Sequence, residues 1–265
     1  MLGIAFVLLQ YMISAKAGLV NYVDGQTNVH PHEQVAEGSP IETQAHGHVE
    51  LLLTPGVFLR IGNNSKVVLD SVELSHAVVR VIDGSALIEV TQIEKGTPIK
   101  VVTGGLETMV VSRGAYRFSA GTASVIDGKL QIVGTQMTVR KGHQVTSAGG
   151  SYIASTFVNT TDDLDLWSQS RSASLANANA MAYRDRPLRS TWIYSPFLGG
   201  FTFMPRGGYR SYYGYGFYGY GFVPVPAPVL PFRTFPPSRP PVRPMPRPGG
   251  VHRPGFHGGG RGGHR

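Results

Sequence analysis

The feature that most restricts the fold of this chain is a succession of short apolar segments, each ended by a turn that contains Gly. Residues 39–62 and 97–120 align without a gap and share Pro, Ile and Gly at equivalent places. In each copy a Gly turn, residues 54–56 or residues 112–114, separates two apolar runs. Apolar runs of about four to eight residues bounded by turns are typical of β-strands. The repeat therefore predicts an all-β domain whose similar units stack their apolar faces.

A second repeated element is an Asp-Gly pair flanked by β-branched residues, which occurs at Asp24, Asp83 and Asp127. Such a pair predicts a β-hairpin, because type I′ turns need positive φ at both central residues. Further along, each pair is followed by another Gly turn. We predict a repeat-built all-β domain over residues 18–158, arranged as a two-layered solenoid or sandwich. The later Gly turns are Glu37-Gly38, Lys95-Gly96 and Lys141-Gly142.

Residues 159–186 are predicted to form one helix. Thr160 or Thr161 supplies the N-cap, the acidic residues that follow complement the helix dipole, and Pro187 ends the helix. A loose apolar stripe favours packing against the β-domain, and docking of a partner helix is the alternative. The stripe consists of Leu164, Trp167, Leu175 and Met181.

The composition changes after the predicted helix. The formal net charge of the chain is +8, and ten Arg lie between Arg189 and Arg265, whereas no Asp, Glu or Lys follows Asp185. The basic charge therefore lies in the C-terminal part, which is also rich in Pro and Gly. Because such a composition buries little apolar surface, we predict that residues 187–265 form a largely disordered, low-complexity tail. Its aromatic and Gly-rich beginning is expected to form loose strands or to adhere to a surface.

The N-terminal segment, residues 1–17, is predicted to be a signal peptide. Its apolar run is too short to span a bilayer comfortably, and Ala15 and Ala17 form a small-x-small cleavage pattern. Lys16 is the first charged residue, so the basic start typical of a signal peptide is absent. An uncleaved membrane anchor and a buried N-terminal strand or helix are the alternatives. The absence of Cys excludes disulfides, thiolate nucleophiles and Cys-ligated zinc.

Four stretches share one pattern of Gly turns and apolar alternation: GLVNYVDGQTNV, VAEGSPIET, GHVELLLTPGVFLRIGNNSKV and VRVIDGSALIEV. Together they resemble the FecR domain over about residues 18–150. The resemblance implies a periplasmic all-β module, often part of regulators that relay surface signals to sigma factors. The chain is more similar to stand-alone exported FecR-domain proteins with an aromatic-Gly tail, because no cytoplasmic helical segment precedes its apolar run. The segment DLDLWSQSR resembles the sequence that follows the domain in such proteins.

Two His-x-His pairs, His30 with His32 and His46 with His48, are the candidate metal ligands. In a strand, residues i and i+2 point to one face and could bind zinc or nickel. Because both pairs flank turns, we interpret them as surface histidines.

Candidate catalytic groups are equally weak. His76 and His143 could each be combined with Ser and Asp, but no nucleophile elbow is present. The three Asp of the Asp-Gly pairs are explained by their turns, and Gly104-Gly105 precedes no helix that would bind phosphate. We predict no catalytic, cofactor-binding or metal-binding residue, and no enzyme activity.

Arg-Gly-Gly occurs at residues 206–208 and 261–263 among aromatic residues. In a cytosolic protein this pattern suggests RNA binding. Two copies are few and export would keep the tail from RNA, so anionic envelope polysaccharide is the favoured partner of the tail, with no fixed partner as the alternative. We predict a non-catalytic exported protein with a structural or interaction role at the periplasm or cell surface. The alternative is an inner-membrane signalling component that modulates a sigma-factor/anti-sigma-factor system. The oligomeric state stays open.

Overall fold

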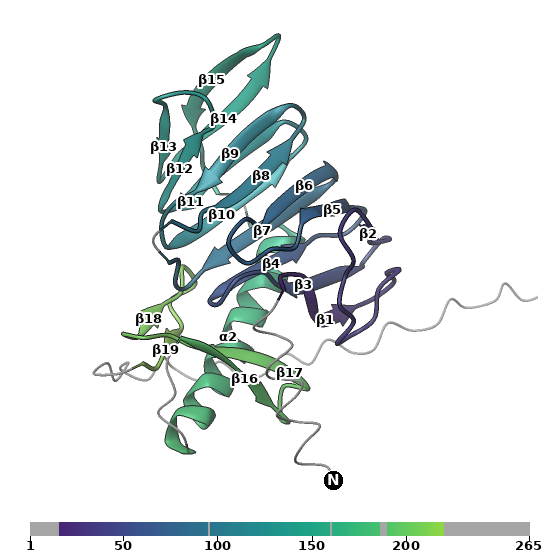
Figure 1. Ribbon diagram of the computed structural model, residues 1–265, viewed down its shortest axis with the longest axis vertical. Helices are drawn as coiled ribbons and strands as arrows, with labels where there is room; N and C mark the ends of the chain where they lie inside the picture. The colour runs from purple at the N-terminus through teal and green to yellow at the C-terminus, as the bar shows by residue number, and fades with distance from the viewer. Residues whose placement is uncertain (1–15, 95, 160, 186–189, 220–265) are drawn as a thin grey trace, which may run out of the picture. The chain divides into compact units, whose positions relative to one another are not determined.

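The computed structural model describes residues 16–94, 96–159, 161–185 and 190–219, and all elements below lie in these ranges (Figure 1). Two large sheets pack face to face as a sandwich, and one helix accompanies them in the described part of the chain. The prediction of a two-layered, mostly β fold is therefore confirmed. The strand order does not show a solenoid, and neither sheet closes on itself. No helix among the described residues is long and apolar enough to cross a membrane.

Both sheets add their strands in the order in which the strands occur along the chain. Strand numbers rise steadily across both sheets, so the chain passes between the layers while it advances along the sandwich. Pairing is antiparallel except between β6 and β8. Sheet A has the order β1 (Leu19–Asp24), β3 (His48–Leu52), β4 (Val57–Ile61), β7 (Ser85–Val90), β10 (Gly114–Ser119), β11 (Thr122–Asp127), β14 (His143–Ala148) and β15 (Ser151–Thr156). Sheet B has the order β13 (Thr138–Arg140), β12 (Lys129–Ile132), β9 (Leu106–Val110), β8 (Ile99–Thr103), β6 (Val78–Asp83), β5 (Lys66–Ser71) and β2 (Pro40–Glu42).

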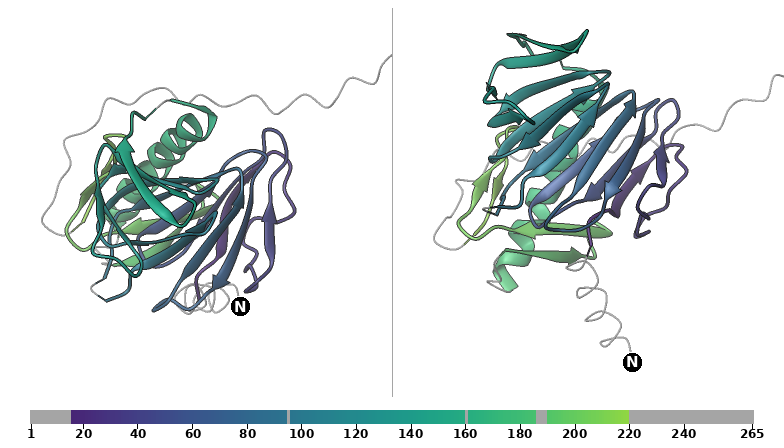
Figure 2. Two further views of the ribbon diagram at one scale, coloured as in Figure 1. Left: turned by 90° about the horizontal axis from the view of Figure 1, so that it is seen from above. Right: turned by 45° about the horizontal axis from the view of Figure 1, so that its top comes forward.

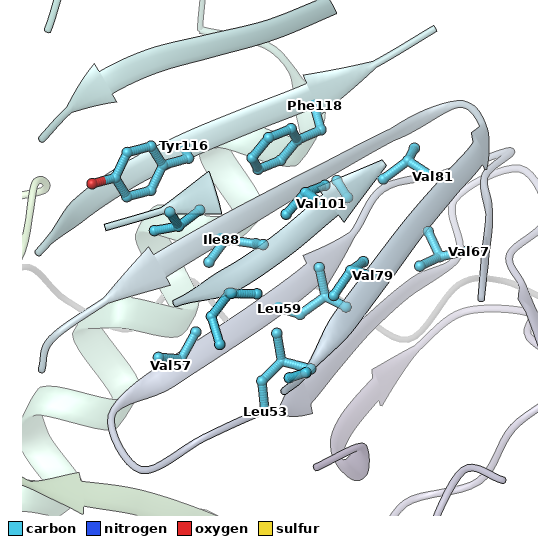
Figure 3. Close-up of a cluster of buried hydrophobic side chains, with 14 of the residues drawn as sticks. Leu53, Val57, Leu59, Val67, Val79, Val81, Ile88, Val101, Tyr116 and Phe118 are labelled. Atoms are coloured by element: carbon cyan, nitrogen blue, oxygen red, sulfur yellow. The ribbon is translucent and has the colours of Figure 1, made fainter. Parts of the chain in front are cut away.

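The main core lies between the sheets. Alternate residues of a strand point to one face, so Val57 and Leu59 of β4 reach the core together with Ile88 of β7. Val79 and Val101 enter it from sheet B (Figure 3). All five side chains are fully buried, and each contributes about 1.5–3 kcal/mol by leaving water.

The sequence repeat is only partly a structural repeat. β2 and β8 both lie in sheet B, and β4 and β10 both lie in sheet A on either side of β7. The middle strands differ, because β3 belongs to sheet A and β9 to sheet B. The turn at residues 54–56 therefore closes a hairpin within sheet A, whereas the turn at residues 112–114 carries the chain from sheet B to sheet A. The sequence records the difference, since β3 is buried along its whole length and β9 alternates between buried and half-buried residues.

The predicted hairpins at the Asp-Gly pairs are wrong. At Asp83-Gly84 the chain leaves sheet B for sheet A, and at Asp127-Gly128 it passes from A to B. Only the Gly has positive φ, whereas a type I′ turn requires it at both residues. Gly is needed because these corners are tight: a Cβ at Gly128 would lie 2.1 Å from the hydroxyl of Tyr116. The later turns are as predicted, with positive φ at Gly38, Gly96 and Gly142.

Helix α2 (Asp163–Asp185) packs on the outer face of sheet A, the face turned away from sheet B (Figure 2). Packing against the β-domain is thus confirmed. The N-cap is Asp162 rather than Thr160 or Thr161, because its Oδ1 accepts a hydrogen bond of 3.0 Å from the N–H of Asp165. Three members of the predicted stripe are buried, but Met181 is 51% exposed.

The structure differs most from the prediction at the start of the proposed tail. Residues 190–219 fold into two hairpins, formed by β16 (Thr191–Ser195) with β17 (Gly200–Met204) and by β18 (Tyr209–Arg210) with β19 (Gly216–Phe217). Their aromatic side chains form a second core with α2 and the outer face of sheet A. It includes Leu52, Phe58, Leu175, Trp192, Phe201, Phe203 and Phe217. The predicted signal segment up to residue 15 and the tail from residue 220 lie outside the described residues.

Candidate functional site

A cluster of buried charges lies between sheet A and α2. Arg60 of β4 is paired with the neighbouring strands: its Nε lies 3.0 Å from Oε2 of Glu50 on β3, and its Nη1 lies 2.7 Å from Oε2 of Glu89 on β7. All three side chains are buried. Two carboxylates and one guanidinium leave one negative charge uncompensated among buried side chains, so the sheet requires a further cation.

The helix supplies that cation. Nη2 of Arg171 lies 2.8 Å from Oε1 of Glu50, and its guanidinium carbon lies 4.0 Å from the ring centre of Tyr22. The neighbouring Ser172 donates a hydrogen bond of 2.5 Å to Glu89. We call these four ionic residues, Glu50, Arg60, Glu89 and Arg171, the helix-anchoring network. They balance in charge only when α2 is docked.

The helix-anchoring network does not have the properties of an acid–base site. Burial by itself would raise the pKa of Glu50, but the guanidiniums of Arg171 and Arg60 outweigh burial and lower that pKa to about 2. Burial opposes the charge of Arg60 as well, yet Glu89 and Glu50 raise its pKa. Neither group releases or takes up a proton near neutral pH. We therefore assign the network to holding the helix on the sheet.

One of the predicted surface histidines is instead buried. The His48 ring stacks on Trp167 with centres 4.9 Å apart, and its Nε2 lies 3.0 Å from a carboxylate oxygen of Asp163. Burial lowers the pKa of His48, and the nearby Asp163 and Asp24 oppose that shift. The indole N–H of Trp167 donates to Asp24 over 3.2 Å. The sequence did not indicate this burial because the covering residue comes from α2, far along the chain.

The other histidines are separate from one another. Nε2 of His32 lies 2.8 Å from the carbonyl oxygen of Gly199, and His46 occupies a turn with a φ of 62°. His143 begins β14, where its ring contacts the carbonyl of Lys141, and His76 lies in the connection from β5 to β6. Within the described ranges, no group of three or more His, Asp or Glu is placed to hold a metal ion.

A cationic pocket lies where the two C-terminal hairpins, β16–β17 and β18–β19, meet the sandwich. Its volume is about 390 Å³, and two arginines, Arg113 from the turn between β9 and β10 and Arg206 after β17, line it. Both side chains are exposed, and neither guanidinium forms an ion pair with a described residue. The remaining lining residues are Gln92, Ile93 and Glu94, from the connection between β7 and β8.

Gln92 fixes the position of this pocket. Its buried side chain accepts a hydrogen bond of 3.1 Å from the backbone N–H of Arg206 and donates one of 3.0 Å to the hydroxyl of Ser190. The hairpin segment is thereby tied to the sandwich at the point where both arginines face solvent. A guanidinium binds carboxylate and phosphate groups with two parallel hydrogen bonds. Two unpaired guanidiniums beside one carboxylate, that of Glu94, favour an anionic ligand here.

The sequence indicated only part of this pocket. Arg206 belongs to an Arg-Gly-Gly motif at the start of the predicted tail, whereas the repeat predicts only a turn at Arg113. A signal was present, because Arg113 stands where the first copy of the repeat has Pro55. A charged residue that replaces Pro in a turn indicates an exposed position. That Gln92 lines the same pocket follows only from the fold.

Together, the fold and these clusters define a class: a two-sheet β-sandwich with one helix clamped to it by buried charges and a cationic pocket at its side. No family model matches the sequence, and no curated protein matches it. Two crystal structures of a "putative anti-sigma factor" from Parabacteroides distasonis ATCC 8503 match it in structure, each with a TM-score of 0.37 and 16% identity. The matches cover 52% and 56% of this chain, and 65% and 72% of those chains. Membership of the FecR family stays a prediction from the sequence.

Proposed function

We propose that this protein is a non-catalytic, exported protein of the FecR-domain type that contacts anionic envelope polymers at the periplasm or cell surface. The observation that carries the proposal is the pair of unpaired guanidiniums, Arg113 and Arg206, at the pocket beside the sandwich. A built pocket positions one anionic group of a polymer, such as a uronic acid carboxylate or a sugar phosphate. The nine other Arg from Arg189 onward offer further contacts along the same polymer.

Weak contacts of this kind reinforce one another. Once the pocket holds one group of a polymer, the next contact is effectively intramolecular, so avidity exceeds the affinity of any single site. Exposed charge pairs are screened by salt, since the Debye length falls to about 8 Å at physiological ionic strength. Binding is therefore expected to weaken as salt is added.

The test is binding of the full chain to polygalacturonate, with neutral dextran as the polymer control. Replacing both pocket arginines, Arg113→Gln with Arg206→Gln, is expected to weaken binding about tenfold, as the loss of charge-assisted hydrogen bonds predicts. Arg140→Gln with Lys129→Gln removes the same charge from exposed positions outside both the pocket lining and the Arg-rich segment, and is the matched control. Equal binding by both double variants, or no preference for polygalacturonate over dextran, would contradict the proposal.

The alternative is a signalling component that binds a membrane regulator and modulates a sigma-factor/anti-sigma-factor system. The resemblance of the sequence to FecR domains supports it. Cell fractionation with intact mass of the recovered chain separates the two. A processed chain in the periplasm or at the surface supports the envelope role, whereas a full-length chain in the inner membrane supports signalling.

A further inference from the structure

Three of the four edges of the two sheets are protected from pairing with another chain. Along the outer side of β1, the N–H of Val20 donates to the carbonyl of Glu33 and its carbonyl accepts from His32. Along β2, the side chain of Asn28 bonds to the backbone of Pro40 and Glu42. β13 is only three residues long and ends in a charged Arg. Short, covered or charged edges are the usual means by which proteins prevent edge-to-edge association.

β15, the last strand of sheet A, has none of these protections (Figure 1). Its sequence is SYIAST, with no charge and no Pro, and its register with β14 is regular over six residues. Five of its six residues are exposed, and the Ile153 side chain is 56% exposed. An open, regular and uncharged edge is a template for a further strand.

The pairing with β14 fixes which backbone groups of β15 face outward. The N–H of Ser147 donates to Gly121, on the side of β11, so Ser147 and its partner Tyr152 form a non-hydrogen-bonded pair. Because the two kinds of pair alternate, the backbone groups of Tyr152, Ala154 and Thr156 point away from β14. No described residue bonds to them.

We propose that this edge pairs with β15 of a second copy of the chain, antiparallel and with the twofold axis at Ile153. In this register Tyr152 lies opposite Ala154 of the partner subunit, and the two exchange the outward hydrogen bonds identified above. Ile153 then meets Ile153 of the partner subunit as a non-hydrogen-bonded pair, the arrangement in which side chains approach most closely. The residue numbers of each opposed pair differ by an even amount, so the side chains of a pair lie on the same face. The core faces of the two copies of sheet A therefore stay on the same side.

A second copy suits this edge better than the rest of the same chain. The edge carries no charge, so two copies meet without repulsion, and the register above is self-complementary as a twofold interface requires. The sequence after residue 219 instead places Pro at short intervals, and Pro lacks the N–H that strand pairing uses. A six-residue edge buries less than the about 1,200 Å² of specific, stable interfaces, so the dimer is expected to be weak and concentration dependent.

The chain has no Cys, which permits a direct test by single substitution. Ile153→Cys places two thiols opposite each other across the twofold axis, at a Cα separation of about 4.5 Å that a disulfide can bridge. Mild oxidation is expected to give a covalent dimer. Ile82→Cys, at a similarly exposed Ile on β6, is the matched control and is expected to stay monomeric.

Adding Ala154→Pro to the Ile153→Cys chain is expected to abolish cross-linking. It removes an outward N–H that β14 does not use, so circular dichroism should remain unchanged. In parallel, sedimentation of the unmodified chain from micromolar to millimolar concentration should show dimerisation, which Ile153→Lys removes and Ile82→Lys leaves in place. Equal cross-linking of the two Cys variants would overturn the proposal. So would a dimer that persists in Ile153→Lys, or a monomer with Tyr152 and Ala154 amides protected from exchange.

Discussion

Replacing Arg171 with Met tests whether the helix-anchoring network holds α2 on the sheet. Met keeps most of the apolar length of the side chain but removes the charge, together with the contact of the guanidinium with the Tyr22 ring. Arg60 is then the sole cation for two carboxylates, Glu50 and Glu89, in a fully buried place. One negative charge is left without compensation.

The expected loss follows from the cost of leaving a buried charge without its partner. Removing one partner of a buried ion pair costs about 3–5 kcal/mol, because the remaining charge is buried alone. The lowered pKa of Glu50 has the same sign, because the guanidiniums of Arg171 and Arg60 together outweigh burial and stabilise its charged form. We expect Arg171→Met to lower the free energy of unfolding by about 3 kcal/mol, a large part of the 5–15 kcal/mol typical of a domain.

Urea unfolding at pH 7 measures this loss as a lower midpoint at unchanged slope. Arg80→Met is the matched control, since Arg80 pairs with Asp70 at the surface, where solvent screening leaves an ion pair little effect on stability. Adding Glu50→Gln to Arg171→Met should restore part of the stability, because the orphaned charge disappears. If Arg171→Met stays within about 0.5 kcal/mol of the unmodified chain, the charge argument is refuted.

Three further outcomes are expected. Because the pKa of Glu50 is lower in the folded state, its contribution is complete above pH 4.5 and is lost as the pH falls toward 2, so unfolding free energies between pH 7 and pH 3 should decline less steeply in Glu50→Gln. Gly128→Ala should lower the free energy of unfolding in urea by more than about 2 kcal/mol, because its Cβ would meet the phenol group of Tyr116 and φ is positive. Gly38→Ala, with open space around it, should cost about 1 kcal/mol. Equal losses would contradict the steric account. A chain that begins at Gly18 should melt at a lower temperature than one that retains Ala17. It loses a buried residue whose N–H donates to the carbonyl of Val72, and it places a charged terminus at a buried position. Identical melting temperatures would show that the fold begins later.

The two-layered β architecture could be predicted because it depends on local signals. Alternation of apolar residues and the Gly turns specify short strands whatever their partners are. The partners themselves are non-local, and a turn sequence does not say which sheet the next strand joins. The Asp-Gly pairs are the example: the same residues that close a hairpin elsewhere act here as corners between the layers, because Gly128 is packed under Tyr116. The sequence does not predict the fold of residues 190–219 for a related reason: their aromatic side chains have no period of their own and are ordered by packing with α2 and sheet A.

Charged residues within buried strands indicate where a further layer covers the sheet. Glu50 and Arg60 lie in strands that are buried along their whole length, which indicates a second layer over the outer face of sheet A. That layer consists of α2 and the hairpins, and the cationic pocket exists only where they meet the sandwich, because Gln92 holds the backbone of Arg206 there. Anchoring of the helix and formation of the pocket are thus parts of one assembly step. Loosening the helix-anchoring network with Arg171→Met should therefore weaken polygalacturonate binding as well, although Arg171 does not line the pocket.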